Sequence, residues 1–375
     1  VPHLRFPEFS GEWKMCTIGE LTTKVGSGVT PRGGEAVYKT EGHPFVRSQN
    51  VGLGNLLLDD IAFIDEETHL RQKSTELQFN DVLLNITGAS IGRSALVDKQ
   101  IVGGNVNQHV CIIRTKENLV PSFICSFLLS NYGQRQIDSF QAGGNRQGLN
   151  FEQIKSIKIT IPSKDEQIKI AKLLRAIDER IATQNKIIDK LQSLIKGLRV
   201  CCMQRNGSDN VYLSEIAQIY QPQTISSAEL TEDGFLVYGA NGIIGKYKDY
   251  NHKTEQICIT CRGNTCGMVN YTKPMSWITR NAMVINTDKY QDKVYKKYLY
   301  HYLSAYNFNS IISGSGQPQI VRTPLEKLKI TLPTISEQKQ KAMILDKIQD
   351  KIEINHNVLN LYILQKQYLL RQMFI

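Results

Sequence analysis

The sequence patterns that most often carry phosphate or methyl-transfer chemistry are incomplete in this chain. A phosphate-binding loop needs two glycines separated by four residues, then Lys and Ser or Thr, so that backbone N–H groups can cradle the phosphate. The nearest approach runs from Gly239 to Tyr247, with one residue too many between its glycines and a tyrosine in the hydroxyl position. A methyltransferase would need an Asn/Asp-Pro-Pro-aromatic loop, and no two prolines are adjacent. We therefore expect no catalytic residues in this chain.

Cysteine and histidine residues are present but do not form a recognisable set of metal ligands. Cys258 and Cys261 are separated by two residues on a predicted strand, and Cys266 follows them. No second Cys or His pair stands at zinc-finger spacing, so we expect no metal site. His109 has no carboxylate or Cys motif beside it, which favours a structural or hydrogen-bonding role over a catalytic one.

A different set of polar side chains is suited to reading the bases of DNA. Arg and Lys recognise guanine, and Asn and Gln recognise adenine, when loops present them to the major groove. The chain has 45 Lys and Arg against 35 Asp and Glu, and this net charge of +10 is compatible with a polyanionic partner. In the first half of the chain the candidate DNA-contacting residues are Thr30, Arg32, Arg47, Gln49, Arg93, Asn107, Gln108, Asn145, Arg146 and Gln147. In the second half they are Asn241, Lys246, Arg262, Asn264, Arg280, Asn281, Gln317 and Gln319. The alternative for each of them is a solvated surface group.

The elements that must position these side chains come in two copies. Pro162 in the first copy falls on Pro333 in the second, 171 residues later. Other matched segments are Glu166-Gln167 with Glu337-Gln338, 142–145 with 313–316 and, more loosely, 88–92 with 263–267. The chain is therefore predicted to contain one structural unit twice.

A long amphipathic helix is predicted after each matched proline. From Asp165 to about Gln204 there is no proline, and apolar residues recur at alternating spacings of four and three, as in a coiled coil. A helix of this length, on the order of 60 Å, cannot bury its seam by local folding, so we expect the two helices to pair. If an approximate two-fold axis relates the copies, the pairing is antiparallel. The predicted seam comprises Ile170, Leu174, Ile177, Ile181, Gln184, Ile188, Leu191, Ile195, Leu198, Leu345, Ile348, Ile352, Asn355, Leu359, Leu369 and Met373.

Two amides interrupt this apolar seam at equivalent positions, Gln184 and Asn355. A buried amide lowers stability but can fix the register and orientation of paired helices. The alternative is that either side chain lies at a wet edge of the seam.

The segments outside the helices are predicted to be mixed α and β. Expected strands include 81–86, 110–113, 157–161, 256–260 and 282–285, and expected short helices include 121–130 and 293–304. The predicted fold class is α+β, with two mixed α/β domains each followed by a long helix, and with the helices paired as an antiparallel coiled coil of pseudo-two-fold symmetry. The predicted domains are 1–163 and 206–334, and the predicted helices are 164–205 and 335–375.

The cysteine usage and hydropathy favour a cytoplasmic protein. The eight cysteines include the adjacent pair Cys201 and Cys202 and do not form a disulfide framework. We find no secretory signal and no apolar run near the ~20 residues that a membrane span requires. We therefore expect no contact with a membrane.

Two globular units, each followed by a long heptad helix, resemble the specificity subunits of type I restriction-modification systems. Local segments agree with this resemblance. Leu4–Phe9, Trp13 and Ile18–Leu21 are similar to the start of many members. Gly42–Val51 and Tyr238–Gly245 are similar to two versions of a strand in their target-recognition domains. The two Pro…Glu-Gln junctions resemble the junctions that lead into their long helices. The resemblance covers nearly the whole chain.

The resemblance implies a non-catalytic subunit that binds double-stranded DNA. Each target-recognition domain would read one half of a bipartite site, and the coiled coil would set the unread spacer between the halves. Two modification (methyltransferase) subunits would dock on it, and restriction subunits would join them. No cofactor is expected in this chain; S-adenosylmethionine, ATP and Mg are expected on the partner subunits. Because the loops of the two domains differ, we expect an asymmetric site.

Two other functions are compatible with the sequence. One is a scaffold that does not bind DNA, in which the coiled coil joins two protein-binding domains. This function does not explain the excess of Lys and Arg over Asp and Glu. The other is the recognition region of a fused restriction–methylase enzyme, which a catalytic domain in the same reading frame would reveal. Neither explains the duplicated order of domain and helix better.

Overall fold

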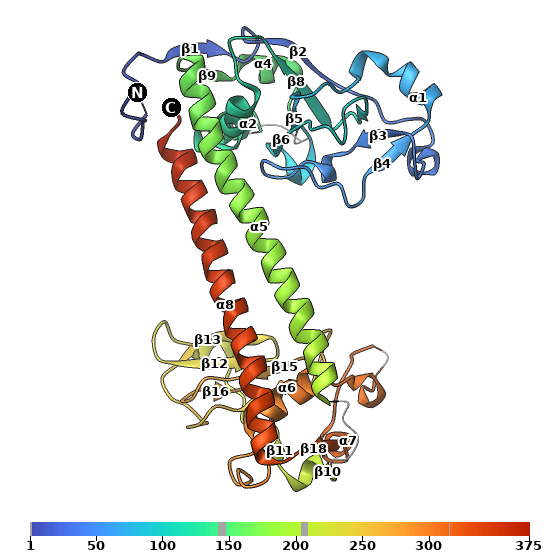
Figure 1. The fold of residues 1–375 in the computed structure, drawn as a ribbon, viewed down its shortest axis with the longest axis vertical. Helices are drawn as coiled ribbons and strands as arrows, with labels where there is room; N and C mark the ends of the chain where they lie inside the picture. Colours follow the sequence, from blue (N-terminus) through green and yellow to red (C-terminus); the bar gives the residue numbers. More distant parts are fainter. Residues whose placement is uncertain (1, 142–147, 204–208, 315) are drawn as a thin grey trace. The chain divides into compact units, whose positions relative to one another are not determined.

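The computed structural model describes residues 2–141, 148–203, 209–314 and 316–375 (Figure 1). It divides into two compact units: unit 1 is 1–185 with 358–375, and unit 2 is 186–357. The long helices α5 (Lys164–Met203) and α8 (Ile335–Gln372) each contribute one part to unit 1 and the other part to unit 2.

Unit 1 is built on a four-stranded antiparallel sheet in the order β2-β8-β5-β6. Its strands are β2 (Thr22–Ser27), β8 (Val110–Thr115), β5 (Val82–Asn85) and β6 (Ser94–Leu96). Both faces of β5 are buried. Val82 and Leu84 belong to the core beneath helix α2 (Pro121–Leu129), whereas Leu83 belongs to a second cluster on the opposite face. Successive side chains of a strand point to opposite faces, so the uninterrupted apolar run in this segment reflects a sheet that is covered on both sides.

The remaining elements of unit 1 surround this sheet. A smaller sheet has the order β4-β3-β7, with β3 antiparallel to β4 and parallel to β7, and a ribbon pairs β1 with β9. Their bounds are β1 (Lys14–Thr17), β3 (His43–Val46), β4 (Ala62–Ile64), β7 (Asn105–Val106), β9 (Lys158–Ile161), α1 (Glu66–Arg71), α3 (Asn131–Ser139), α4 (Phe151–Ser156), η1 (Gly34–Val37), η2 (Ser48–Asn50), η3 (Lys73–Thr75) and η4 (Gly88–Ser90).

Unit 2 repeats this topology strand for strand. Its sheets have the orders β11-β17-β14-β15, β13-β12-β16 and β10-β18, and β12 is antiparallel to β13 and parallel to β16. The predicted α+β fold and internal duplication are therefore confirmed. The bounds are β10 (Asp209–Tyr212), β11 (Gln218–Tyr220), β12 (Phe235–Gly239), β13 (Gly242–Tyr247), β14 (Ile257–Thr260), β15 (Val269–Tyr271), β16 (Trp277–Ile278), β17 (Ala282–Asn286), β18 (Lys329–Leu332), α6 (Lys296–Ala305), α7 (Arg322–Glu326), η5 (Leu213–Glu215), η6 (Ser227–Glu229) and η7 (Phe308–Ile311).

In each unit, α5 and α8 pack against each other in opposite directions. In unit 1, Ile170 and Leu174 near the start of α5 share a buried cluster with Leu369 and Met373 near the end of α8. In unit 2, Ile195 near the end of α5 shares a cluster with residues nearer the start of α8. The other predicted seam residues are Ile177, Gln184, Ile188, Leu345, Ile352 and Asn355, which are buried, and Ile181, Leu191, Leu198, Ile348 and Leu359, which are partly buried.

Candidate nucleic-acid interface

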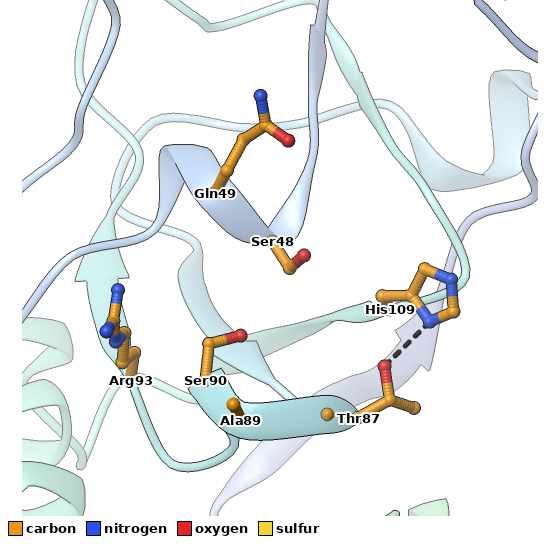
Figure 2. Close-up of a pocket in the computed structure, with 8 residues that line it drawn as sticks. Ser48, Gln49, Thr87, Ala89, Ser90, Arg93 and His109 are labelled. Carbon is orange, nitrogen blue, oxygen red and sulfur yellow. Dashed lines mark hydrogen bonds between the residues drawn. The ribbon is translucent and has the colours of Figure 1, made fainter. Parts of the chain in front are cut away.

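An open hollow of about 430 Å³ in unit 1 collects polar side chains from three connections of the fold (Figure 2). One connection is η2, which follows β3; the second joins β5 to β6 through η4; the third joins β7 to β8. Figure 2 shows side chains from all three around one space. The lining residues are Ser48, Gln49, Thr87, Gly88, Ala89, Ser90, Arg93 and His109.

The connection between β5 and β6 is a tight turn closed by two glycines. Gly88 and Gly92 have φ angles of 72° and 85°, a left-handed conformation that favours glycine. The Ile91 N–H donates to the Gly88 carbonyl (3.1 Å), and the Gly92 N–H donates to the Asn85 carbonyl (3.0 Å). The buried Asn85 amide donates to the Ser48 carbonyl (2.8 Å) and so joins η2 to this turn.

A chain of hydrogen bonds orients the third connection. The Thr30 N–H donates to Gln108 Oε1 (2.9 Å), and Gln108 Nε2 lies 3.1 Å from His109 Nε2. Because an amide nitrogen only donates, His109 Nε2 accepts, and a neutral ring then carries its proton on Nδ1. That nitrogen lies 2.6 Å from Thr87 Oγ1, the contact drawn in Figure 2.

Four of the residues predicted in the first half gather here, Thr30 through its hydrogen bonds to Gln108, and others do not. Gln49 and Arg93 line the hollow, and Gln108 adjoins it through His109. Asn107 is buried and its side chain accepts the His109 N–H (3.0 Å), so we assign it a structural role.

Two further predicted arginines of unit 1 have different surroundings. The Arg47 guanidinium donates to the Asp60 carbonyl (2.6 Å) and lies 5.4 Å above the Tyr38 ring, so its side chain is engaged within the unit. Arg32 is exposed on the loop before η1. The predicted residues Asn145, Arg146 and Gln147 lie outside the described residues.

Unit 2 contains the same turn at the equivalent place. Gly263 and Gly267 have φ angles of 86° and 92°. The Cys266 N–H donates to the Gly263 carbonyl (2.9 Å), and the Gly267 N–H donates to the Thr260 carbonyl (2.8 Å). Thr260 also donates its hydroxyl to the Ala240 carbonyl, as Asn85 donates to Ser48 in unit 1. The looser sequence match between 88–92 and 263–267 is thus a structural equivalence.

Most of the predicted residues of the second half meet around this turn. Arg262 forms a β-bridge with Gln319, and the two line an open hollow of about 360 Å³. The Asn281 carbonyl accepts the Cys261 N–H (3.1 Å). Asn241 accepts a hydrogen bond from the Thr265 hydroxyl. Exposed in the same turn or loops are Asn264, Arg280 and Gln317.

Lys246 is the exception in unit 2. It lies toward the other end of the β12–β13 hairpin from Asn241, and its Nζ is 3.4 Å from Asp233 Oδ1. The pair is exposed and contributes little stability, so Lys246 can release Asp233 for a phosphate. We therefore separate Lys246 from the base-reading candidates.

Sequence reasoning missed several residues that line the two hollows. These are Ser48, Thr87, Ser90 and His109 in unit 1, and Tyr220, Gln221 and Arg322 in unit 2. The signal that could have found them is the pair of Gly-x-x-x-Gly turns, because each turn brings its neighbouring loops together. Neither set of lining residues contains Asp or Glu, which suits a polyanionic partner.

The cysteines of unit 2 have structural surroundings. Cys258 is buried in β14, and burial raises the pKa of its thiol. Cys261 Sγ lies 3.2 Å from the Asn281 carbonyl. Within the described ranges, no three or more His, Cys, Asp or Glu side chains are grouped so that they could hold a metal ion. Over the same part of the chain, we find no helix with the length and apolar character that a membrane span requires.

Comparisons with known proteins relate most of the chain to one family. Residues 10–193 and 206–361 match the model of the type I restriction modification DNA specificity domain. The putative type I restriction enzyme MjaX specificity subunit of Methanocaldococcus jannaschii is 23% identical over 386 residues, which cover 92% of this chain and 89% of the relative.

Two solved structures share the fold. The S subunit of a type I restriction-modification system from M. genitalium is 16% identical, with a TM-score of 0.69 over 100% of this chain and 99% of the other. A chain from a structural study of complex assembly and conformational transition in the type I R-M system is also 16% identical, with a TM-score of 0.58 and 97% coverage of both chains.

Proposed function

We propose that this chain, which belongs to the type I restriction-modification DNA specificity family, reads an asymmetric two-part DNA site through two target-recognition domains. Residues 1–163 and 206–334 form these domains, and each reads one half-site. The helices α5 and α8 pair between them and set the length of DNA that is not read.

The observation that carries this proposal is the duplicated polar surface. In both units a Gly-x-x-x-Gly turn follows β5 or the equivalent strand β14. The buried residue at the end of that strand, Asn85 or Thr260, donates a hydrogen bond to the loop after β3 or β12. The framework is shared, but the side chains presented on it differ: Gln49, Arg93 and His109 in unit 1, and Asn241 and Arg262 in unit 2. Two different half-sites require this combination, the same backbone framework in both units with different hydrogen-bond donors and acceptors on it.

The proposal assigns catalysis to the partner subunits. Two modification subunits dock on the helices and supply the S-adenosylmethionine used to methylate adenine, and restriction subunits supply ATP- and Mg-dependent steps. This chain contributes DNA recognition and assembly, in the cytoplasm.

Exposed apolar side chains on α8 are the proposed docking surface for the modification subunits. In unit 1, Leu361, Leu364 and Tyr368 are 64%, 60% and 56% exposed, and their spacing places them on one helix face. In unit 2, Met343 and Ile354 are 57% and 56% exposed. Apolar residues in such a row on a helix that already buries its other face are typical of a protein interface.

The experiment that tests the proposed function is methylation mapping. The chain is co-expressed with its modification subunit, and methylated adenines are mapped along the host DNA by long-read sequencing. We expect a new two-part motif with a fixed unread gap that is absent without this chain. Absence of new methylation, despite a stable complex and an active methyltransferase, would overturn the proposal.

Paired variants assign each half of the motif. Arg93→Ala should relax one half of the motif only, and Arg262→Ala the other half only, because each base-reading contact contributes about 1–3 kcal/mol of discrimination. Arg71→Ala is the matched control: Arg71 is exposed and pairs with Glu67 on α1, away from the hollow. Equal relaxation of both halves by either variant would contradict the assignment.

A further inference from the structure

Two consecutive isoleucines are exposed to solvent near the tip of the β12–β13 hairpin. Ile243 is 55% exposed and Ile244 is 52% exposed, although isoleucine is among the residues most often buried. The pairing shifts register here, with Val237 opposite Gly245 and Tyr238 opposite Ile243, so Ile244 is the extra residue of a β-bulge and both isoleucines are left exposed. A partner that covers an apolar group at this tip would remove the cost of this exposure.

Ile243 is the member of the pair that adjoins the candidate base-reading residues. It pairs across the hairpin with Tyr238, so both side chains lie on the same face. The tip is tied to the Gly263–Gly267 turn, because Asn241 accepts from Thr265, and to β15, because the Ala240 carbonyl accepts from Asn270 Nδ2 (3.4 Å).

Ile244 has a different position. A Cβ added to Gly239 would lie 2.8 Å from Ile244 Cγ2, so the Ile244 side chain lies over the backbone of its own hairpin. The two residues therefore have the same chemistry and similar exposure but opposite faces, which makes Ile244 a matched control for Ile243.

In unit 1 the connection at the equivalent position is built differently, although it also carries exposed apolar side chains, Leu53 and Leu57. Val46 and Tyr238 are equivalent, because their carbonyls accept the backbone N–H groups of Asn107 (3.1 Å) and Thr279 (2.9 Å) after the parallel strands. After Val46 the chain enters η2, whereas after Tyr238 it turns directly into β13. Among the described residues, an apolar group at the tip of a tight hairpin is thus found in unit 2, whereas the exposed leucines of unit 1 lie on a longer connection.

We propose that Ile243 contacts the 5-methyl group of a thymine in the half-site that unit 2 reads. This inference rests on the proposed function. Thymine presents its methyl group in the major groove, and apolar side chains recognise it there. Asn241, beside Ile243, carries the amide that pairs with adenine, so together the two residues favour A·T pairs.

The charge distribution along the hairpin allows its tip to approach DNA. Residues 239–245 contain no Asp or Glu, whereas Asp233 and Asp249 flank the opposite end of the hairpin. An entering tip without acidic groups avoids repulsion from the phosphates.

The test removes the methyl group from the DNA and its partner from the protein. Duplexes carrying the mapped target are made with deoxyuridine in place of each thymine of this half-site, one at a time. Binding is measured with the complex of this chain and its modification subunit. The wild-type complex should lose about fourfold in affinity at one position, which corresponds to one buried methyl group.

The variants distinguish the proposed contact from a general effect on binding. Ile243→Ala should bind the thymine and deoxyuridine duplexes equally, and Ile244→Ala should keep the wild-type ratio. An unchanged ratio in Ile243→Ala, a lost ratio in Ile244→Ala, or no deoxyuridine effect in the wild type would each overturn the inference. In those cases specific binding persists and the proposed function stands; if no duplex is bound specifically, the proposed function fails instead.

Discussion

Gln167 and Gln338 make the same three hydrogen bonds at the starts of α5 and α8. Gln167 accepts the Val120 N–H (2.9 Å) and donates to the carbonyls of Asn118 (3.1 Å) and Pro162 (3.0 Å). Gln338 accepts the Tyr295 N–H (2.8 Å) and donates to the carbonyls of Lys293 (3.1 Å) and Pro333 (2.9 Å). In each unit one amide therefore ties the long helix to the loop before a short helix, α2 or α6.

We expect this amide to be a main connection between each domain and its helix. Both residues are 1% exposed, and truncation removes three hydrogen bonds in each unit that are buried or part-buried. Gln167→Ala and Gln338→Ala should each lower the free energy of unfolding by about 2 kcal/mol or more. Denaturant unfolding of the purified chain, or of its complex with the modification subunit, measures this loss.

Exposed glutamines on the same helices provide the controls. Gln192→Ala and Gln365→Ala should change the free energy of unfolding by less than about 0.5 kcal/mol, as expected for exposed positions. A Gln167→Ala variant as stable as Gln192→Ala would contradict the connecting role.

The stability of unit 2 should depend on pH through two histidines. Burial lowers the pKa of His301, and Arg199 lowers it further, although Asp346 accepts from Nε2 (3.0 Å) and partly offsets this. Burial also lowers the pKa of His252. The pKa of a histidine in the unfolded chain is about 6.5. Below that pH the unfolded chain binds more protons than the folded chain, in which both histidines have lowered pKa values. The free energy of unfolding should therefore fall as the pH decreases below about 6.5.

Thermal unfolding of the whole chain between about pH 8 and about pH 5 measures this dependence, which falls in the titration range of histidine. His301→Gln keeps an acceptor for Arg199 and a donor for Asp346 but does not titrate. It should reduce the slope below about pH 6.5. Burial alone would raise the pKa of Asp346, but the hydrogen bond from His301 and the charge of Lys297 lower it. Asp346 therefore titrates only at lower pH. A slope identical in the wild type and the variant would exclude His301 as its source.

The docking surface on α8 predicts a selective loss of assembly. Leu361→Glu with Leu364→Glu should abolish stable co-purification with the modification subunit, because two charges would be buried in an apolar interface. The chain itself should remain folded, since both side chains are more than half exposed. Leu70→Glu, at a position 56% exposed on α1, is the control and should leave co-purification unchanged.

The elements that follow from periodicity could be predicted from the sequence. The heptad pattern predicts a helix from Asp165 to about Gln204, and α5 runs Lys164–Met203. The expected strands at 110–113 and 282–285 correspond to β8 and β17, in equivalent positions of the two sheets. Both predictions depend on local spacing, which a single chain displays directly.

The choice among exposed polar residues could not be predicted in the same way. Arg47 and Arg93 are both arginines predicted to contact DNA, yet Asp60 and Tyr38 engage the first, whereas the second lines the hollow. Their fates depend on which distant segments fold beside them. His109 illustrates the same limit, because the sequence favours a structural or hydrogen-bonding role for it, whereas its place beside Thr87 depends on the β-sheet.

The length of the paired helices should determine the unread spacer of the DNA site. Removing seven residues from each helix, 186–192 in α5 and 351–357 in α8, preserves the heptad register and shortens the pairing by about 10 Å. At about 3.4 Å per base pair, the mapped motif should lose about three base pairs of its gap while both half-sites stay the same. Removing four residues from each helix instead shifts the apolar seam and should abolish methylation. An unchanged gap in the seven-residue variant would show that the helices do not set the spacer.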